Sequence, residues 1–178
     1  MLRTILLGIL AVGVIAVAFI ASRPSTFTVE RTAVVAAPPD AVYALLNDFH
    51  QWNQWSPWEK LDPNLKRAFD GPANGPGAKY AWVGNERVGE GSMEIVESVP
   101  GQSVAIDLEF KKPFAAKNKT TFTLTPSGQG TQVRWKMTGD QGFVGKAMSL
   151  VMDMDKLVGK DFEQGLANLN AAAVQGAR

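Results

Sequence analysis

Cysteine is absent from this chain of 178 residues, and histidine occurs only once, as His50. The lack of Cys excludes disulfides, thiol nucleophiles and thiolate metal sites, and a single His excludes His-rich metal centres. An excess of one charge is also missing, because 18 Lys and Arg residues face 17 Asp and Glu residues, for a formal net charge of +1. Nucleic-acid-binding domains normally carry a clear basic excess. We therefore expect no nucleic-acid partner and no metal, and no motif in the chain predicts a cofactor.

One uncharged apolar run, from Ile5 to Ala21, follows the single positive charge of Arg3. At roughly 17 residues it would be about 25 Å long as a helix, the lower end of what spans a bilayer. In one interpretation it is a signal peptide, cleaved at the A-x-A-like site Ala16-Val17-Ala18. In the other, it is a retained single-pass membrane anchor. We favour the anchor, because cleavage would leave apolar residues at the new terminus.

The apolar run ends at Arg23 and Pro24, where we place the domain boundary. We assign residues 1–23 to the membrane anchor or signal segment and residues 24–178 to one folded domain, which is too short to form two. The charges that flank the run are too even to orient it. Its short head favours the usual signal-anchor direction, with Met1 inside and the domain exported. The predicted location is therefore a membrane, with the domain outside the cytoplasm.

Beyond the anchor, the chain first predicts one strand and two short helices. Residues 27–36 are rich in Val and Thr, which favours a strand. Pro38-Pro39-Asp40 ends that strand and opens a short helix over residues 41–46. Residues 49–58 are dense in Trp and contain Pro57, which indicates a second short helix followed by a loop.

From Leu65 to Met137 apolar and polar residues alternate with a period of two, as in half-buried strands. The clearest run places Val104, Ile106, Leu108 and Phe110 on one face, and Ala105, Asp107 and Glu109 on the other. Gly- and Pro-rich turns separate consecutive runs. Consecutive strands with tight turns and one apolar face predict an antiparallel meander that is covered on one side.

The last segment supplies the cover for that apolar face. Its apolar residues recur at steps of three and four, as on one side of a helix: Val144, Met148, Val151, Val158, Phe162, Leu166 and Leu169. This spacing predicts a long amphipathic helix, broken near Asp153–Asp155 or softened at Gly159. The predicted fold class is α+β, with a curved antiparallel sheet of about seven strands wrapped on the C-terminal helix.

This order of elements, and several short motifs, resemble the START-like (SRPBCC) superfamily and its polyketide cyclase/dehydrase-like branch. The similarity covers about residues 27–173 and is carried by residues 37–43, 52–58, 80–85, 89–91 and 159–163. The resemblance implies a helix-grip fold with a cavity between the sheet and the long helix, a cavity often used for lipids, sterols or aromatic polyketides. It transfers no catalytic signature to any residue of this chain.

We predict that the inward-facing residues of the sheet, the tryptophan-rich segment and the methionines of the last segment bind the ligand. These residues are Trp52, Trp55, Trp58, Tyr80, Trp82, Met93, Ile95, Leu108, Phe110, Phe122, Leu124, Trp135, Met137, Met148 and Met152. The tryptophans of residues 52–58 have two equal interpretations, as the roof of a cavity or as packing between the short helices and the sheet. The main hypothesis is a membrane-tethered domain that binds a hydrophobic or amphipathic, lipid-like small molecule.

Two other functions stay open. A cyclase- or dehydratase-type enzyme would need an acid or base inside the cavity, and Glu97 is the only strand carboxylate with the parity of Met93 and Ile95. His50 is a weak alternative, since a lone His near a helix start more often caps the helix or lies on the surface. In a structural or partner-binding role, the cavity would be collapsed and the anchor would matter more.

Two charged clusters also have competing interpretations. Asp153, Asp155, Asp161 and Glu163 do not follow calcium-loop spacing, so a helix face with ion pairs is the favoured interpretation. Lysines surround Phe114 at a predicted hairpin end, at positions 111, 112, 117 and 119. They either keep the sheet edge soluble, which we favour, or contact anionic lipid headgroups.

Overall fold

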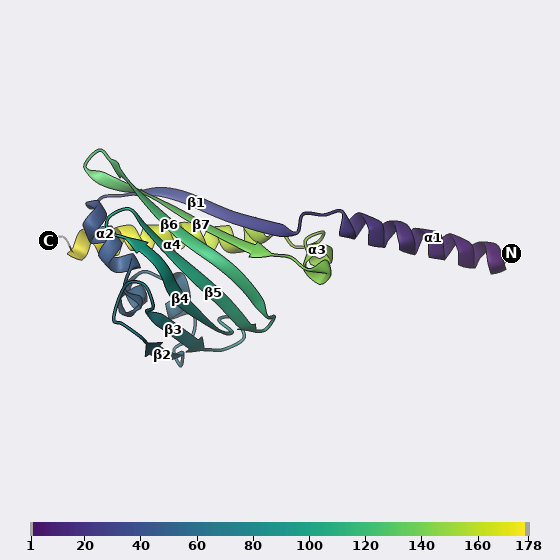
Figure 1. The fold of residues 1–178 in the computed structure, drawn as a ribbon, viewed down its shortest axis with the longest axis horizontal. Helices are drawn as coiled ribbons and strands as arrows, with labels where there is room; N and C mark the ends of the chain where they lie inside the picture. The colour runs from purple at the N-terminus through teal and green to yellow at the C-terminus, as the bar shows by residue number, and fades with distance from the viewer. Residues whose placement is uncertain (1, 177–178) are drawn as a thin grey trace.

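The computed structural model describes residues 2–176, which form four α-helices, two short 3₁₀ helices and one seven-stranded sheet (Figure 1). The helices are α1 (Leu2–Ala21), α2 (Pro39–Leu46), η1 (Phe49–Gln54), η2 (Pro57–Lys60), α3 (Phe143–Met148) and α4 (Met154–Gly176). The strands are β1 (Thr26–Val35), β2 (Lys66–Asp70), β3 (Lys79–Val83), β4 (Glu90–Val99), β5 (Ser103–Lys112), β6 (Ala116–Ser127) and β7 (Gly130–Asp140).

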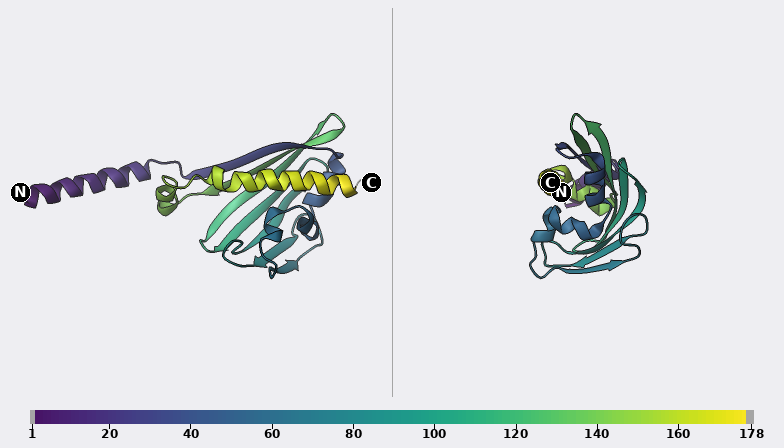
Figure 2. Two further views of the ribbon diagram at one scale, coloured as in Figure 1. Left: turned by 180° about the vertical axis from the view of Figure 1, so that it is seen from behind. Right: turned by 90° about the vertical axis from the view of Figure 1, so that its left-hand side faces the viewer.

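The sheet is antiparallel throughout, with the strand order β1-β7-β6-β5-β4-β3-β2. Strands β2 to β7 therefore form a meander of neighbours, and β1 joins its far edge by pairing with β7. Figure 2 shows the sheet curling around α4, with the short helices beside it on the same concave side. The predicted α+β fold, with seven strands wrapped on a C-terminal helix, is confirmed.

Helix α4 lies along β1 and buries one stripe of side chains against the sheet. Phe162, Leu166 and Leu169 on this stripe are almost completely buried, as their spacing predicts. The long helix is broken close to the predicted position near Asp153, because α3 ends at Met148 and α4 begins six residues later, at Met154. Asp153 Oδ1 there accepts hydrogen bonds from the backbone N–H groups of residues 155 and 156 and caps the start of α4.

Because of this interruption, the apolar residues before α4 do not continue its buried stripe. Val144 is 71% exposed and Val151 is 84% exposed. The prediction that they cover the sheet is wrong. Helical spacing alone does not show that the chain leaves the sheet between β7 and α4.

An aromatic cluster joins α4 to the centre of the sheet. The ring of Trp135 on β7 stacks on Phe162 of α4 with 3.9 Å between the centroids, and it lies 4.9 Å from Phe122 of β6. Gly165 makes this approach possible, because a Cβ at that position would lie only 2.7 Å from Cζ3 of Trp135. The absence of a side chain at Gly165 therefore lets the Trp135 ring lie directly against the helix.

Helix α1 stands apart from the folded domain (Figure 1). None of its described residues is buried, and its 20 mostly apolar residues have the length and composition of a helix that could cross a membrane. At 1.5 Å per residue it is about 30 Å long, the thickness of a bilayer core. Lys146 Nζ of α3 donates a hydrogen bond to the carbonyl oxygen of Ala21 at 3.0 Å, which places α3 beside the end of α1.

Candidate functional site

A cavity of 290 Å³ lies between the concave face of the sheet, η2 and α4. Its wall is mostly apolar, and its lining residues come from nearly every element of the domain. They are Phe27, Trp52, Ser56, Trp58, Glu59, Leu65, Tyr80, Trp82, Arg87, Val88, Met93, Leu108, Phe110, Ala116, Asn118, Thr120, Trp135, Met137, Met154, Val158, Asp161 and Phe162. By volume it has room for on the order of ten water-sized groups.

Nine of the residues predicted to bind a ligand line this cavity. They are Trp52, Trp58, Tyr80, Trp82, Met93, Leu108, Phe110, Trp135 and Met137. Alternation along the strands placed the seven strand residues of this set on the inner face, and the curvature of the sheet brings them around one space with Trp52 of η1 and Trp58 of η2.

The other six predicted residues lie outside the cavity wall. Trp55, Ile95, Phe122 and Leu124 belong to the solid core. Alternation predicts which face of the sheet a residue occupies, but not whether its position along the strand lies in the core or beside the cavity. Helix α2 packs on the sheet over the ends of β5 and β6, so the residues there belong to the core. Met148 and Met152 lie in the segment that precedes α4, away from the cavity, and Met152 is 41% exposed.

The two interpretations of the tryptophan-rich segment each apply to part of it. Trp55 has no exposed surface, and its Nε1 donates to the carbonyl of Leu45 at 3.2 Å, so it is a packing residue. Trp52 and Trp58 line the cavity, and Trp52 Nε1 donates to the carbonyl of Leu46 at 3.2 Å. Trp52 thus packs η1 against α2 and forms part of the cavity wall.

One side of the cavity wall carries a hydrogen-bonded ion pair that alternation along the strands did not predict. Glu59 of η2 accepts hydrogen bonds from the Tyr80 hydroxyl at 2.5 Å and from Arg67 Nε at 2.6 Å. Burial and then the Glu59 carboxylate raise the pKa of Tyr80 above its ordinary value. Tyr80 is the hydrogen-bond donor to Glu59, while Arg67 balances the charge of the carboxylate.

Asp161 is a second carboxylate on the wall, contributed by α4. Burial raises its pKa, and a hydrogen bond from the Trp58 side chain opposes that shift in part. The spacing of the helix could have identified it, because Asp161 lies three residues after Val158 on the inward stripe. It is the one acidic residue of the predicted charged cluster that reaches the cavity.

The strand carboxylate chosen from the sequence, Glu97, is not in the cavity. A β-bulge shifts the register of β4, so that Ile95 pairs with Ile106 whereas Glu97 pairs with Ala105. The extra residue, Val96, reverses the alternation, and Glu97 is exposed. The inference that Glu97 shares the inward parity of Ile95 is therefore wrong.

The remaining candidates lie elsewhere. His50 is half-exposed, its Nδ1 is 2.9 Å from Asp48 Oδ1, and its ring stacks on Phe69 at 4.1 Å. Asp153 forms an ion pair with Lys156 at 3.6 Å, as expected for a charged helix face. Asp155 and Glu163 are also ion-paired, but with Arg31 of β1. Within residues 2–176, no group of three or more acidic or His side chains is arranged to hold a metal ion.

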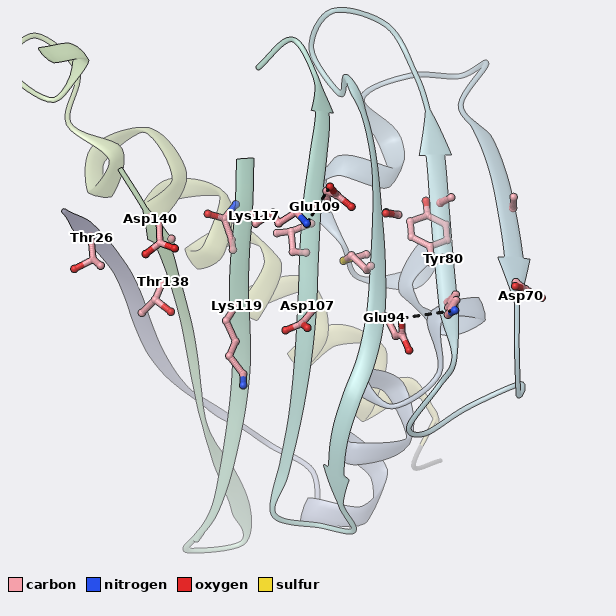
Figure 3. A pocket seen from close by; sticks show the side chains of 18 residues that line it. Thr26, Asp70, Tyr80, Glu94, Asp107, Glu109, Lys117, Lys119, Thr138 and Asp140 are labelled. Carbon is pink, nitrogen blue, oxygen red and sulfur yellow. Dashed lines mark ion pairs between the residues drawn. The ribbon is translucent and has the colours of Figure 1, made fainter. Parts of the chain in front are cut away.

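A larger hollow of 790 Å³ lies on the outer face of the sheet (Figure 3). Its labelled side chains are mostly charged, and Glu94, Asp107 and Glu109 lie there as alternation along the strands predicts. Lys79 forms an ion pair with Glu94 at 3.7 Å, and both side chains are about half-exposed. This hollow is open and its charges are solvated, so we take the smaller apolar cavity as the functional site.

Two polar atoms on the cavity wall have no hydrogen-bond partner among the described residues. They are the side-chain atoms Oδ1 of Asn118 on β6 and Nε1 of Trp135 on β7; both atoms are buried, and both residues line the cavity. Asn118 extends over Gly139 of the neighbouring strand, since a side chain at Gly139 would overlap its amide oxygen. These are the only two such atoms in residues 2–176.

A curved antiparallel sheet that grips a C-terminal helix around an apolar cavity defines the helix-grip fold of START-like proteins. The family model described as polyketide cyclase/dehydrase and lipid transport matches residues 26–174. The chain therefore belongs to the polyketide cyclase/dehydrase and lipid transport family. No curated protein sequence matches it.

Solved structures share the fold at low sequence identity. Protein MLL2253 from Mesorhizobium loti is 18% identical with a TM-score of 0.61, over 84% of this chain and 98% of that protein. Protein CV1439 from Chromobacterium violaceum is 20% identical with a TM-score of 0.59, over 85% of this chain and 98% of that protein. The Aha1 dimer from Colwellia psychrerythraea is 15% identical with a TM-score of 0.59, over 83% and 96% of the two chains. At these identities the likeness establishes the fold alone.

Proposed function

We propose that this chain binds a hydrophobic or amphipathic, lipid-like small molecule in the cavity, and that α1 tethers the domain to a membrane. The observation that carries the proposal is the apolar cavity of 290 Å³ between sheet and helix. Pockets that bind small molecules are concave and mostly apolar, with a few polar groups that fix orientation. This cavity meets that description, and its volume lies near the lower end of the usual range.

The membrane tether is supported by the surface beside α1. The segment from α3 to the start of α4 exposes large apolar side chains, namely Phe143, Val144, Leu150, Val151 and Met152. Contiguous apolar patches on soluble surfaces usually mark contacts with a partner or a membrane. Since α3 touches the end of α1, this patch would lie at the membrane surface if α1 spans the bilayer, with residues 24–178 as the exported domain.

Dye displacement tests the ligand proposal. The purified chain in detergent should bind the uncharged fluorescent dye N-phenyl-1-naphthylamine saturably, one molecule per chain. Leu108→Trp should weaken that binding at least about tenfold, because the larger ring fills the cavity. Val83→Trp is the matched control, since Val83 is half-exposed, does not line the cavity, and should leave binding unchanged. Absent dye binding, or equal binding by both variants, contradicts the proposal.

Membrane extraction and intact mass test the tether. After alkaline carbonate washing, the protein should remain in the membrane pellet with an intact mass that includes residues 1–23. A soluble product that begins after Ala18 would instead show that the segment is a cleaved signal peptide. Accessibility of the domain to external protease in intact cells or spheroplasts would test the exported orientation.

An enzyme of cyclase or dehydratase type is the second candidate, and Asp161 is the observation that favours it. A carboxyl group with a raised pKa on a cavity wall is a candidate general acid. Asp161→Asn should then abolish turnover of an aromatic polyketide substrate and leave dye binding intact. Glu97→Gln on the outer face serves as the control. Equal turnover by the wild type and Asp161→Asn would remove this candidate.

A further inference from the structure

Among the tryptophans that line the cavity, Trp135 is the one whose buried indole N–H group has no hydrogen-bond partner within residues 2–176. Nε1 of Trp52 donates to the carbonyl of Leu46, and Nε1 of Trp82 donates to the carbonyl of Val88, each at 3.2 Å. Trp58 is only partly buried. Trp135 has no such partner, although it is only 2% exposed. Buried Trp N–H groups normally find a partner, so its donor is free for a ligand.

Asn118 supplies the complementary group. Its amide oxygen is an acceptor without a donor, on a side chain that is 9% exposed and lines the same cavity. An unpaired buried polar group costs free energy, so a ligand that pairs with it gains affinity by removing that cost. Two residues that line the same apolar space thus carry one unpartnered donor and one unpartnered acceptor.

The sheet register places the two groups at different levels of the cavity. Trp135 pairs with Phe122 on β6, and Asn118 lies four residues from Phe122 on that strand. Four residues of extended strand correspond to roughly 13 Å between the levels. The ligand that satisfies both groups is therefore elongated, with polar groups at two points along an apolar body.

The charged residues on the cavity wall indicate that the polar groups of the ligand are uncharged. Glu59 is balanced by Arg67, whereas Asp161 has a pKa raised by burial, so its surroundings already disfavour negative charge. Arg87 is the only basic residue among the described lining residues, and it is exposed at the turn between β3 and β4. It can contact a group at the surface but does not neutralise an anion deep in the cavity.

We infer that the cavity recognises an elongated amphiphile with uncharged hydroxyl groups, one oxygen accepting from Trp135 Nε1 and one hydroxyl donating to Asn118 Oδ1. This inference rests on the proposed function and adds to it the chemical class of the ligand. A cavity of this kind binds hydroxylated lipids in preference to plain hydrocarbons and to fatty acids. It also names the two residues that make the distinction.

Four probes with ten-carbon chains test the inference by displacing N-phenyl-1-naphthylamine from the full chain: 1-bromodecane, 1-decanol, 1,10-decanediol and decanoate. A neutral hydrogen bond is worth about a 3- to 10-fold change in affinity. We therefore expect the diol to bind more tightly than the alcohol and the alcohol more tightly than the bromide, in steps of about that size, with decanoate weaker than the alcohol.

Variants assign the two hydrogen bonds. Trp135→Phe and Asn118→Leu should each reduce diol affinity about 3- to 10-fold and leave bromide affinity unchanged within a factor of two. Trp55→Phe is the matched control, because Trp55 does not line the cavity and its N–H group already donates to the carbonyl of Leu45, so this variant should keep the wild-type ranking of probes. Asn118→Leu is close in size to the native residue and keeps the test decisive if Trp135→Phe does not fold.

The outcomes separate this inference from the proposed function. Equal binding of bromide, alcohol and diol would overturn the inference and leave a cavity for plain hydrophobes. Unchanged selectivity in Trp135→Phe and Asn118→Leu would also overturn it, and would assign the two polar atoms to bound water. Failure of the dye and all four probes to bind the wild type would overturn the proposed function, and the inference with it.

Discussion

Arg31 of β1 crosses helix α4 directly over Gly159, so closely that a side chain at Gly159 would overlap its guanidinium group. From this position Arg31 Nη1 reaches Asp155 Oδ1 and Arg31 Nε reaches Glu163 Oε1, each at 2.7 Å. The two carboxylates lie one helical turn on either side of Gly159. The arginine therefore ties the edge strand to the helix beside the cavity, to which the same two elements contribute Phe27 and Val158.

Gly159→Ala should destabilise the domain by about 1–3 kcal/mol, because the new methyl group displaces the Arg31 side chain from both carboxylates. The usual gain in helix propensity from Gly to Ala is about 1 kcal/mol and offsets only part of this loss. Gly176→Ala is the control in the same helix, where a Cβ meets no neighbour within 4 Å. Urea unfolding should show a loss only for Gly159→Ala. Equal stability of the two variants would contradict the account of Gly159.

The Arg31–Asp155 pair predicts a pH dependence. The hydrogen bond from Arg31 lowers the pKa of Asp155 in the folded state below its ordinary value. A lowered folded-state pKa stabilises the fold fully above the unfolded pKa of about 3.9, and this contribution is lost as the pH falls through the folded value. Asp155→Asn should therefore be less stable than the wild type at pH 6, with the difference shrinking below about pH 4 in urea unfolding. A difference that stays constant down to pH 2 would show that the ion pair does not cause it.

Tyr80→Phe should destabilise the fold by about 1–2 kcal/mol, because it leaves one oxygen of the buried Glu59 carboxylate without its donor. The Glu59 side chain is only 7% exposed, so water replaces that hydrogen bond poorly. Tyr43→Phe is a useful comparison, since the Tyr43 hydroxyl pairs with the neutral hydroxyl of Ser98. Thermal unfolding should show a larger loss for Tyr80→Phe. The reverse order would contradict the importance of the Glu59 hydrogen bond.

The apolar patch beside α1 can be located by a single label, because the chain has no native Cys. Val151→Cys, labelled with an environment-sensitive NBD group in reconstituted vesicles, should emit at shorter wavelength and be quenched by brominated lipids. Val34→Cys is the control, since Val34 is 60% exposed but lies on β1, at the end remote from α1. Equal quenching at both positions, or none at Val151, would contradict a membrane-facing patch.

Much of the fold could be predicted from local pattern. Alternation along each strand placed Leu108 and Met137 on the inner face because successive side chains of a strand point to opposite sides. Glu97 shows the limit of this reasoning, since one bulge residue reverses the alternation and leaves no clear signal in the sequence. Met152 shows another limit, because helical spacing continues through a segment that does not pack on the sheet.

The site was less predictable than the fold. That Tyr80 and Trp82 face inward follows from alternation, but the partner of Tyr80 is Glu59, which is 21 residues away and on another element. Likewise, nothing near Trp135 in sequence distinguishes its N–H group from that of Trp52. The difference depends on which backbone carbonyl lies within reach after folding.

The sequence by itself determined the apolar N-terminal segment, the seven strands, the inward face of the sheet and the helix that covers it. These features follow from residue type and short-range periodicity, which depend only on neighbours in the chain. The tertiary structure alone decided which inward residues fill the core and which line the cavity, and it left Asn118 and Trp135 without partners. Whether an inward residue is covered by a helix or faces the cavity, and which polar atoms find a partner, depends on segments that are distant in sequence and meet only in the folded domain.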